Sequence, residues 1–259
     1  MSVAALPRVS LQREGAIGFL TLSNPPRLNA MTRAMWRELR DVVATASQDH
    51  TLRCIVVRGD DASGRAFCAG GDISEYPSFR FDIDSLRAFH EDEVWAALQA
   101  LLDCPVPLVA QIEGACMGAG LEIASCCDVR LAGASSKFGA PIAKLGFPMA
   151  PREAALVHGS IGDALARDML LAAGVHDARR LYDAGFLLKV LPDDDVAAAA
   201  ASHAARIAAL APQAARLNKR TFSMLGAVAS MLPTAYDYAD SAEHREGIAA
   251  FLAKRPAAF

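Results

Sequence analysis

The chain has 259 residues, of which 53% are hydrophobic and 21% charged, and its 26 basic and 29 acidic side chains leave a formal net charge of −3. So much apolar surface with so little net charge excludes a disordered chain. The near-neutral balance, with no basic stripe, argues against nucleic acid or an anionic membrane as the main partner. The length suffices for one large core or two small ones, and we expect a globular protein that binds a small molecule.

Neither a membrane span nor a secretory signal is expected. The longest apolar stretch, residues 105–131, is interrupted by Glu113, Glu122 and Asp128. It therefore falls short of the roughly 20 uncharged residues that a membrane helix needs. Charged residues from Arg8 onward also break up the N-terminal region, where a signal would need an unbroken apolar run. We expect a cytoplasmic protein.

The six cysteines form no C-x-x-C pair, and most lie in apolar runs. A reduced thiol in such a run packs as a small hydrophobic group. We therefore expect core thiols rather than a disulfide framework or a zinc site, and no metal.

In the first half of the chain, strand patterns alternate with helix patterns. Residues 9–23 alternate polar and apolar side chains around Gly15, which predicts a β-hairpin. Thr32 is a suitable cap for a helix that ends near residue 48. The sequence then predicts a strand at residues 54–57, a long helix whose apolar face runs from 86 to 101, strands at 107–112 and 129–132, and an apolar helix between these two.

Beyond Arg152 the pattern becomes helical. Helices are predicted at residues 165–173, 178–184, 196–210, 213–228 and 235–254. The alanine-rich run 197–201 favours a helix over a flexible linker, because alanine has the highest helix propensity. The strands are apolar throughout rather than alternating, which indicates buried sheets covered by helices. The predicted fold class is α/β, with no domain linker.

Two glycine-rich turns hold the residues of greatest chemical interest. They span residues 66–73 and 113–122, and each follows a predicted strand and precedes a predicted helix. Glycine lets the backbone approach a ligand closely. Amide N–H groups from two such turns can converge on one oxygen atom, as in an oxyanion hole. From the pattern alone, a purely structural strand-to-helix turn explains each segment about equally well.

A dinucleotide site is a competing interpretation of the second turn. Its fingerprint, G-x-G-x-x-G/A, requires a third small residue, but Gly118 and Gly120 are followed at that position by Ile123. The chain also contains no G-x-x-x-x-G-K-[ST] phosphate loop. A nucleotide-dependent oxidoreductase is therefore disfavoured.

Taken together, the motifs resemble the crotonase, or enoyl-CoA hydratase/isomerase, superfamily. The resemblance covers nearly the whole chain, and it rests on the two turns and on residues 24–30, 127–132, 138–141, 184–187 and 246–255. It implies a crotonase-like spiral of ββα units at residues 1–195, which form the acyl-CoA-binding core. It further implies a C-terminal helical trimerisation region at residues 196–259, and assembly as a homotrimer or a dimer of trimers.

The resemblance also implies a site. Members of the superfamily bind acyl-CoA thioesters and stabilise an enolate-like anion with two backbone N–H groups, which match Gly71 and Ala119 here, while Glu122 matches a catalytic glutamate. The expected substrate-binding residues are Arg27, Asn29, Ala69, Gly70, Asp72, Ile73, Gly118, Pro141 and Ile142. No cofactor is expected, because coenzyme A is part of the substrate.

Glu122 follows Ala119 by three residues, which places its carboxyl about one helical turn from the expected anion site. In an apolar pocket its pKa should rise, which suits a group that takes and gives a proton near neutral pH. From spacing alone, a glutamate that complements the helix dipole is the better explanation. The resemblance reverses that preference.

The sequence departs from the superfamily at the second hydratase glutamate, because the matching position holds Ile142. Hydration needs both an activated water and a proton delivered to carbon. Glu122 alone could move a proton in an isomerisation or catalyse hydration less efficiently. We therefore expect an enoyl-CoA hydratase or a double-bond isomerase. A CoA-thioester-binding homologue with little catalysis is the alternative, and Glu153 is a candidate substitute for the missing carboxyl.

Other polar residues receive simpler interpretations. His90 and His158 lie among apolar helical residues and are expected to be packed or partly exposed rather than catalytic. Asp72 is expected to accept hydrogen bonds from loop N–H groups. Lys219 and Lys254 are expected to be solvated.

Overall fold

The computed structural model describes residues 6–239 and 241–259. The first five residues of the expected 1–195 core therefore lie outside the described residues. Asp240, within the helix expected at residues 235–254, does so as well.

A six-stranded sheet forms the centre of the molecule, in the order β1-β2-β3-β5-β7-β10. Its strands are β1 (Arg8–Glu14), β2 (Ile17–Ser23), β3 (Cys54–Gly59), β5 (Leu108–Ile112), β7 (Val129–Gly133) and β10 (Lys189–Leu191). β1 and β2 form the predicted antiparallel hairpin, and every other neighbouring pair is parallel. Parallel strands need crossover connections, and helices supply them here.

A second sheet of four short strands lies beside the first, in the order β4-β6-β8-β9. Its strands are β4 (Ala66–Cys68), β6 (Ala115–Met117), β8 (Lys137–Gly139) and β9 (Val175–Asp177). The chain passes from the first sheet to the second in the same way at β3 to β4, β5 to β6 and β7 to β8. This repetition confirms the α/β fold class and the expected spiral of ββα units.

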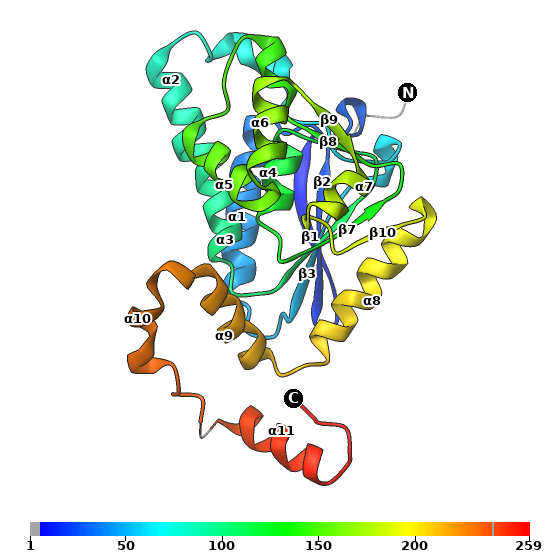
Figure 1. Ribbon diagram of the computed structural model, residues 1–259, viewed down its shortest axis with the longest axis vertical. Helices are drawn as coiled ribbons and strands as arrows, with labels where there is room; N and C mark the ends of the chain where they lie inside the picture. Colours follow the sequence, from blue (N-terminus) through cyan, green and yellow to red (C-terminus); the bar gives the residue numbers. More distant parts are fainter. Residues whose placement is uncertain (1–5, 240) are drawn as a thin grey trace.

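Both faces of the main sheet are covered (Figure 1). The helices are α1 (Arg33–Gln48), α2 (Ile83–Ala88), α3 (Ala96–Asp103), α4 (Ala119–Ser125), α5 (Pro151–Ile161), α6 (Asp163–Leu171), α7 (Ala178–Asp183), α8 (Val196–Ala208), α9 (Pro212–Ser223), α10 (Val228–Met231) and α11 (Ala242–Leu252). In β3, Ile55 and Val57 pack into the larger core, whereas Cys54 and Val56 pack toward α8. Because each face meets a helix layer, the strand is apolar at every one of these positions.

α1 shows how sequence leads to structure here. The Thr32 side chain accepts a hydrogen bond from the Met35 N–H at 3.2 Å, which confirms the predicted cap. Residues at helical spacing from Met35 to Ala46 are buried, so the apolar stripe packs against β1 and α3.

The prediction of a single regular helix around residues 86–101 was wrong in detail. α2 is followed by a π-helical turn, Phe89–Trp95, before α3 begins. A π-helical turn holds an extra residue per turn and changes the direction in which side chains project. The sequence pattern does not show it, because the apolar positions remain compatible with a regular helix.

The expectation of helices alone beyond Arg152 also needs correction. β9 and β10 lie in this region, and each has three residues, which is too short for a periodic signal. Of the predicted helices, 213–228 forms α9 and then the 3-10 turn Leu225–Ala227, with α10 beginning only at its last residue, and only the later part of 235–254 forms α11.

Lys219 is buried, not solvated as expected. Its Nζ donates a hydrogen bond to the Val106 carbonyl at 2.9 Å and forms an ion pair with Asp128 Oδ2 at 2.8 Å. The same carboxylate oxygen accepts from the Leu108 N–H at 2.7 Å. These contacts join α9 to the beginning of β5, whereas Lys254 is exposed as expected.

All six cysteines are free and buried, which confirms the core-thiol interpretation. In the described part of the chain, no helix combines the length and the hydropathy that crossing a membrane requires.

We expect Gly114→Ala to lower the free energy of unfolding far more than Gly15→Ala does. Both glycines have positive φ, +63° and +59°, which costs an alanine about 1–2 kcal/mol. A Cβ at Gly114 would also lie 1.6 Å from the Arg65 carbonyl oxygen, whereas no atom lies within 4 Å of a Cβ at Gly15. Urea unfolding should therefore show a loss of about 3 kcal/mol or more for Gly114→Ala. Equal losses for the two variants would contradict this account.

Candidate active site

The first glycine-rich turn follows β4 and pairs with Met31. The Met31 N–H donates to the Gly70 carbonyl at 2.8 Å, and the Asp72 N–H donates to the Met31 carbonyl at 2.8 Å. This bridge leaves out the N–H of Gly71. Among the hydrogen bonds of the described residues, none uses that N–H as a donor.

The second turn leads directly into α4. Gly118, with φ of +46°, donates its N–H to the Gly139 carbonyl at 2.9 Å, and α4 begins at the next residue, Ala119. The first N–H groups of a helix have no acceptor within the helix. The Ala119 N–H therefore lies at the positive end of the α4 dipole.

The two turns lie against each other. A Cβ at Gly118 would lie 3.6 Å from the Gly70 Cα, and a Cβ at Gly120 would lie 2.5 Å from the Cys68 carbonyl oxygen. The second value is shorter than any real Cβ contact, so α4 packs on β4 at a distance that only glycine permits. Both Gly71 and Ala119 consequently border one cavity.

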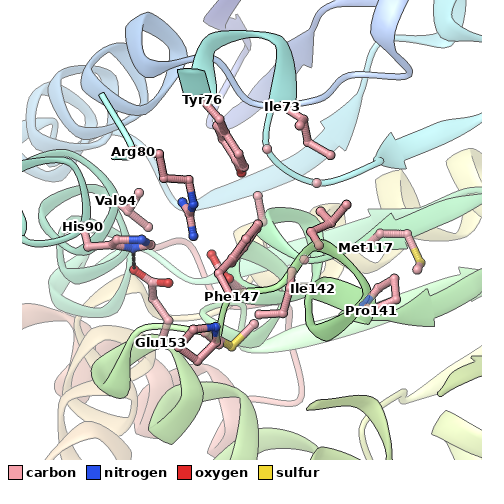
Figure 2. A pocket seen from close by; sticks show the side chains of 18 of the residues that line it. Ile73, Tyr76, Arg80, His90, Val94, Met117, Pro141, Ile142, Phe147 and Glu153 are labelled. Atoms are coloured by element: carbon pink, nitrogen blue, oxygen red, sulfur yellow. Dashed lines mark hydrogen bonds and ion pairs between the residues drawn. The ribbon is translucent and has the colours of Figure 1, made fainter. Parts of the chain in front are cut away.

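That cavity has a volume of about 350 Å³ (Figure 2). Most of its wall is apolar, and its polar side chains come from Tyr76, Arg80, His90, Glu122 and Glu153, with Lys144 near the surface. Its apolar side chains are those of Trp36, Ile73, Phe89, Val94, Met117, Pro141, Ile142, Leu145, Phe147, Pro148 and Met149. A mostly apolar cavity with a few converging polar groups is typical of a small-molecule site.

Glu122 lies in the first turn of α4 and is only 6% exposed. Burial raises its pKa well above the usual value for a glutamate, and the nearby charge of Glu153 raises it further. Both effects favour the neutral, protonated form of Glu122 over its carboxylate in the unliganded cavity.

Glu153, in the first turn of α5, is the second carboxyl of the cavity and is 3% exposed. Its Oε1 lies 2.8 Å from His90 Nδ1, as Figure 2 shows. His90 belongs to the π-helical turn, so that irregular turn places the imidazole in the cavity wall. The expectation that His90 is merely packed was therefore incomplete, whereas His158 is exposed and pairs with Asp163.

Nine of the twelve expected site residues border this cavity. They are Ala69, Gly70, Gly71, Ile73, Gly118, Ala119, Glu122, Pro141 and Ile142. Ile142 lies in the 3-10 turn Pro141–Leu145, where it adds apolar surface. The cavity nevertheless has a second carboxyl, that of Glu153, which comes from another element.

Arg27 and Asn29 lie outside the cavity lining. The Asn29 side chain is buried, and its Nδ2 donates to the Ala66 carbonyl at 2.7 Å while its Oδ1 accepts from the Asn24 N–H at 3.1 Å. Asn29 therefore holds the N-terminal loop against β4. Arg27 is exposed on the same loop, in the 3-10 turn Pro25–Arg27.

Asp72 also lies outside the lining. Its Oδ1 accepts hydrogen bonds from the N–H and the hydroxyl of Ser74, at 3.0 Å and 2.6 Å. It thereby caps the 3-10 helix Ile73–Ser78, which confirms the expectation that it holds loop N–H groups.

Three further residues that line the cavity, Tyr76, Arg80 and Phe147, were not expected from the sequence. A Cβ at Gly71 would lie 2.3 Å from the Tyr76 hydroxyl oxygen, so this phenol reaches the first glycine turn. Burial raises the pKa of Tyr76 to about 12, and the phenol therefore stays protonated. Tyr76 and Arg80 are four positions apart, but no periodic helix pattern marks this segment as part of a site.

Comparisons with known proteins agree with this fold. A family model described as enoyl-CoA hydratase/isomerase matches residues 12–259. A probable enoyl-CoA hydratase from Mycobacterium bovis is 30% identical over 97% of each chain. A 2,3-dehydroadipyl-CoA hydratase from Escherichia coli is 32% identical over 95% of each chain.

Solved structures are similar as well. A crystal structure of an enoyl-CoA hydratase/carnithine racemase from Magnetospirillum magneticum has a TM-score of 0.92 and 37% identity, and the match covers 98% of this chain and 96% of that one. The sheets, the turns and the whole-chain match lead to one conclusion: this chain belongs to the enoyl-CoA hydratase/isomerase family of enzymes.

Proposed function

We propose that this protein acts on an enoyl-CoA thioester, as a hydratase or a double-bond isomerase, through an enolate-like anion. The observation that carries the proposal is the arrangement of one cavity wall. There the free N–H of Gly71 and the first N–H of α4, at Ala119, border the same space as the buried carboxyl of Glu122. The hydratases among the relatives support the same class of substrate.

The thioester oxygen would accept hydrogen bonds from Gly71 and Ala119. Negative charge develops on that oxygen as the enolate forms, and the start of α4 favours it electrostatically. Donors that are already in place require no reorganisation during the reaction. No group beyond the CoA thioester is needed for this step.

The two glutamates would divide the proton transfers of hydration. Glu153 takes a proton from water as the water oxygen bonds to the β-carbon, and protonated Glu122 gives its proton to the α-carbon. His90 positions Glu153 through the hydrogen bond at 2.8 Å. Isomerisation needs only one carboxyl, which removes a proton from one carbon and returns it to another.

The remaining site residues would bind the rest of the thioester. Ala69, Gly70, Ile73 and Gly118 form the wall next to the anion site, and Pro141 and Ile142 add apolar surface for the acyl group. Arg27 is exposed on the loop whose Leu28 carbonyl accepts from the Ala69 N–H at 3.0 Å, so its charge is available to CoA phosphates. Asn29 and Asp72 act by holding these loops in place.

The alternative function is CoA-thioester binding with little catalysis. It rests on Ile142, which leaves the usual second carboxyl position apolar. The neighbouring carboxyl of Glu153 favours the enzyme over this alternative.

We further propose that residues 1–195 form the acyl-CoA-binding core and that residues 196–259 mediate assembly into a homotrimer or a dimer of trimers. α10 and α11 extend away from the sheets in Figure 1. Phe222, Tyr236, Phe251 and Leu252 are 70%, 71%, 84% and 74% exposed in the single chain. Apolar exposure on this scale is typical of a contact surface.

The activity test uses 2-enoyl-CoA and 3-enoyl-CoA substrates with two glutamine variants. We expect Glu122→Gln to lower both hydration and isomerisation by about 10²–10⁴-fold, because the proton carrier is lost. Glu153→Gln should lower hydration much more than isomerisation. Absorbance of the conjugated enoyl group and product masses give both rates, with Glu14→Gln on the exposed hairpin as the control. Full turnover by Glu122→Gln would refute the mechanism, and acyl-CoA binding without turnover in the native enzyme would favour the alternative.

The stability of Glu122→Gln should depend on pH in a defined direction. Because the folded-state pKa of Glu122 is raised, the folded protein keeps a proton that the unfolded chain releases above about pH 4. The native protein therefore loses up to about 1.4 kcal/mol per pH unit through this group until the raised pKa is passed. Melting temperatures should show that the advantage of Glu122→Gln is small near pH 4 and grows toward neutral pH. An advantage that stays constant or shrinks would contradict the raised pKa.

Light scattering should give the mass of three or six chains for the native protein. Replacing Phe251 and Leu252 with serine should weaken the assembly, because both side chains present apolar surface on α11. Leu171→Ser, at an equally exposed leucine of α6, serves as the control. A monomeric native protein at micromolar concentration would refute the proposed assembly.

A further inference from the structure

Arg80 extends into the reaction cavity from the turn between the 3-10 helix Ile73–Ser78 and α2. Its guanidinium carbon lies 3.6 Å from the centre of the Phe147 ring and 4.7 Å from that of Tyr76. Figure 2 shows the side chain pointing toward the interior of the cavity beside these two rings. Phe147 makes the closer of these two aromatic contacts, and neither ring accepts a conventional hydrogen bond from the N–H groups at the edge of the guanidinium.

Those N–H groups have no acceptor within the described part of the chain. No carboxylate lies within 4.0 Å of them, and no side-chain hydrogen bond of Arg80 is present. Neighbouring arginines differ: Arg33 pairs with Glu93 at 2.6 Å, and Arg87 pairs with Asp84 at 2.9 Å. Arg80 is half-buried, and removing part of a cation from water without a hydrogen-bonded partner is costly, so a bound ligand that supplies the partner would be favoured.

Arg80 also marks the far end of the reaction cavity. Together with Tyr76, His90 and Phe147, it lines a second cavity of about 740 Å³. Gly71, Ala119 and Glu122 belong to the first cavity and not to the second. An acyl chain whose thioester occupies the anion site would therefore reach Arg80 on its way into the second cavity.

We propose that Arg80 binds a carboxylate at the far end of the acyl group, so that the substrate is a carboxyl-terminated enoyl-CoA. The inference rests on the proposed function, which places the thioester at Gly71 and Ala119. A carboxylate matches the planar edge of guanidinium with two parallel hydrogen bonds. An aliphatic chain end would leave those donors unsatisfied.

The charges of the cavity are compatible with a third carboxyl group. The raised pKa of Glu122 favours its neutral form, and the Glu153 carboxyl is hydrogen-bonded to His90. Arg80 is the sole arginine among the residues that line this part of the described structure. The incoming carboxylate would therefore complete an ion pair at the junction of the two cavities.

Binding experiments test the inference separately from catalysis. Calorimetry would compare saturated acyl-CoA thioesters in pairs of equal length, one ending in a methyl group and one in a carboxylate. Saturated chains cannot be hydrated, so the result does not depend on turnover. We expect the carboxylate to bind roughly 10-fold tighter at one chain length or more. This preference should be abolished in Arg80→Met, partly retained in Arg80→Lys and unchanged in Arg87→Met.

The outcomes that would overturn the proposal are distinct from a failure of the enzyme. A native protein that binds methyl-terminated chains as tightly at every length would refute it without any variant. A carboxylate preference that survives in a folded Arg80→Met protein would refute it too. If enoyl-CoA turnover is absent but the carboxylate preference is present, only the proposed reaction fails.

Discussion

The packing of α4 on β4 is the constraint on which the site depends. A Cβ at Gly120 would come within 2.5 Å of the Cys68 carbonyl, so helix and strand approach at a distance only glycine permits. This contact brings the N-terminus of α4 beside the turn that follows β4, and with it the N–H groups of Gly71 and Ala119 to one cavity. A larger residue would separate the two turns. The same short helix holds Glu122, so the Ala119 N–H and this carboxyl are positioned together.

The two carboxyls of the cavity have different surroundings. Glu122 lies in apolar surroundings and beside another carboxyl, and both effects favour its neutral form. Glu153 instead meets the imidazole of His90. Two carboxyls with different surroundings are suited to opposite roles in proton transfer. The guanidinium of Arg80 adds a positive charge to the lining of the same space, where it contacts the rings of Tyr76 and Phe147.

The two carboxyls of the cavity come from different elements of the fold. The turn after β8 supplies Ile142, and the beginning of α5 supplies Glu153, yet both border the same cavity. What proton transfer requires is the position of the carboxyl relative to the substrate, not its position along the chain. The departure at Ile142 therefore did not by itself decide whether the cavity had one carboxyl or two.

The sequence alone determined what local patterns can specify. The hairpin around Gly15, the Thr32 cap, the two-sided burial of the strands, the two glycine turns and the start of α4 all follow from short-range rules. The motifs also identified nine residues that border the cavity. Only the tertiary structure brought His90 to Glu153, buried Lys219 against Asp128, and placed Arg80 against the rings of Tyr76 and Phe147. These contacts join residues that are far apart in the chain. Several of these residues lie in a π-helical turn or in irregular loops, which have no periodic sequence pattern. The spacing of residues in the sequence therefore cannot predict the contacts, and only the folded chain determines them.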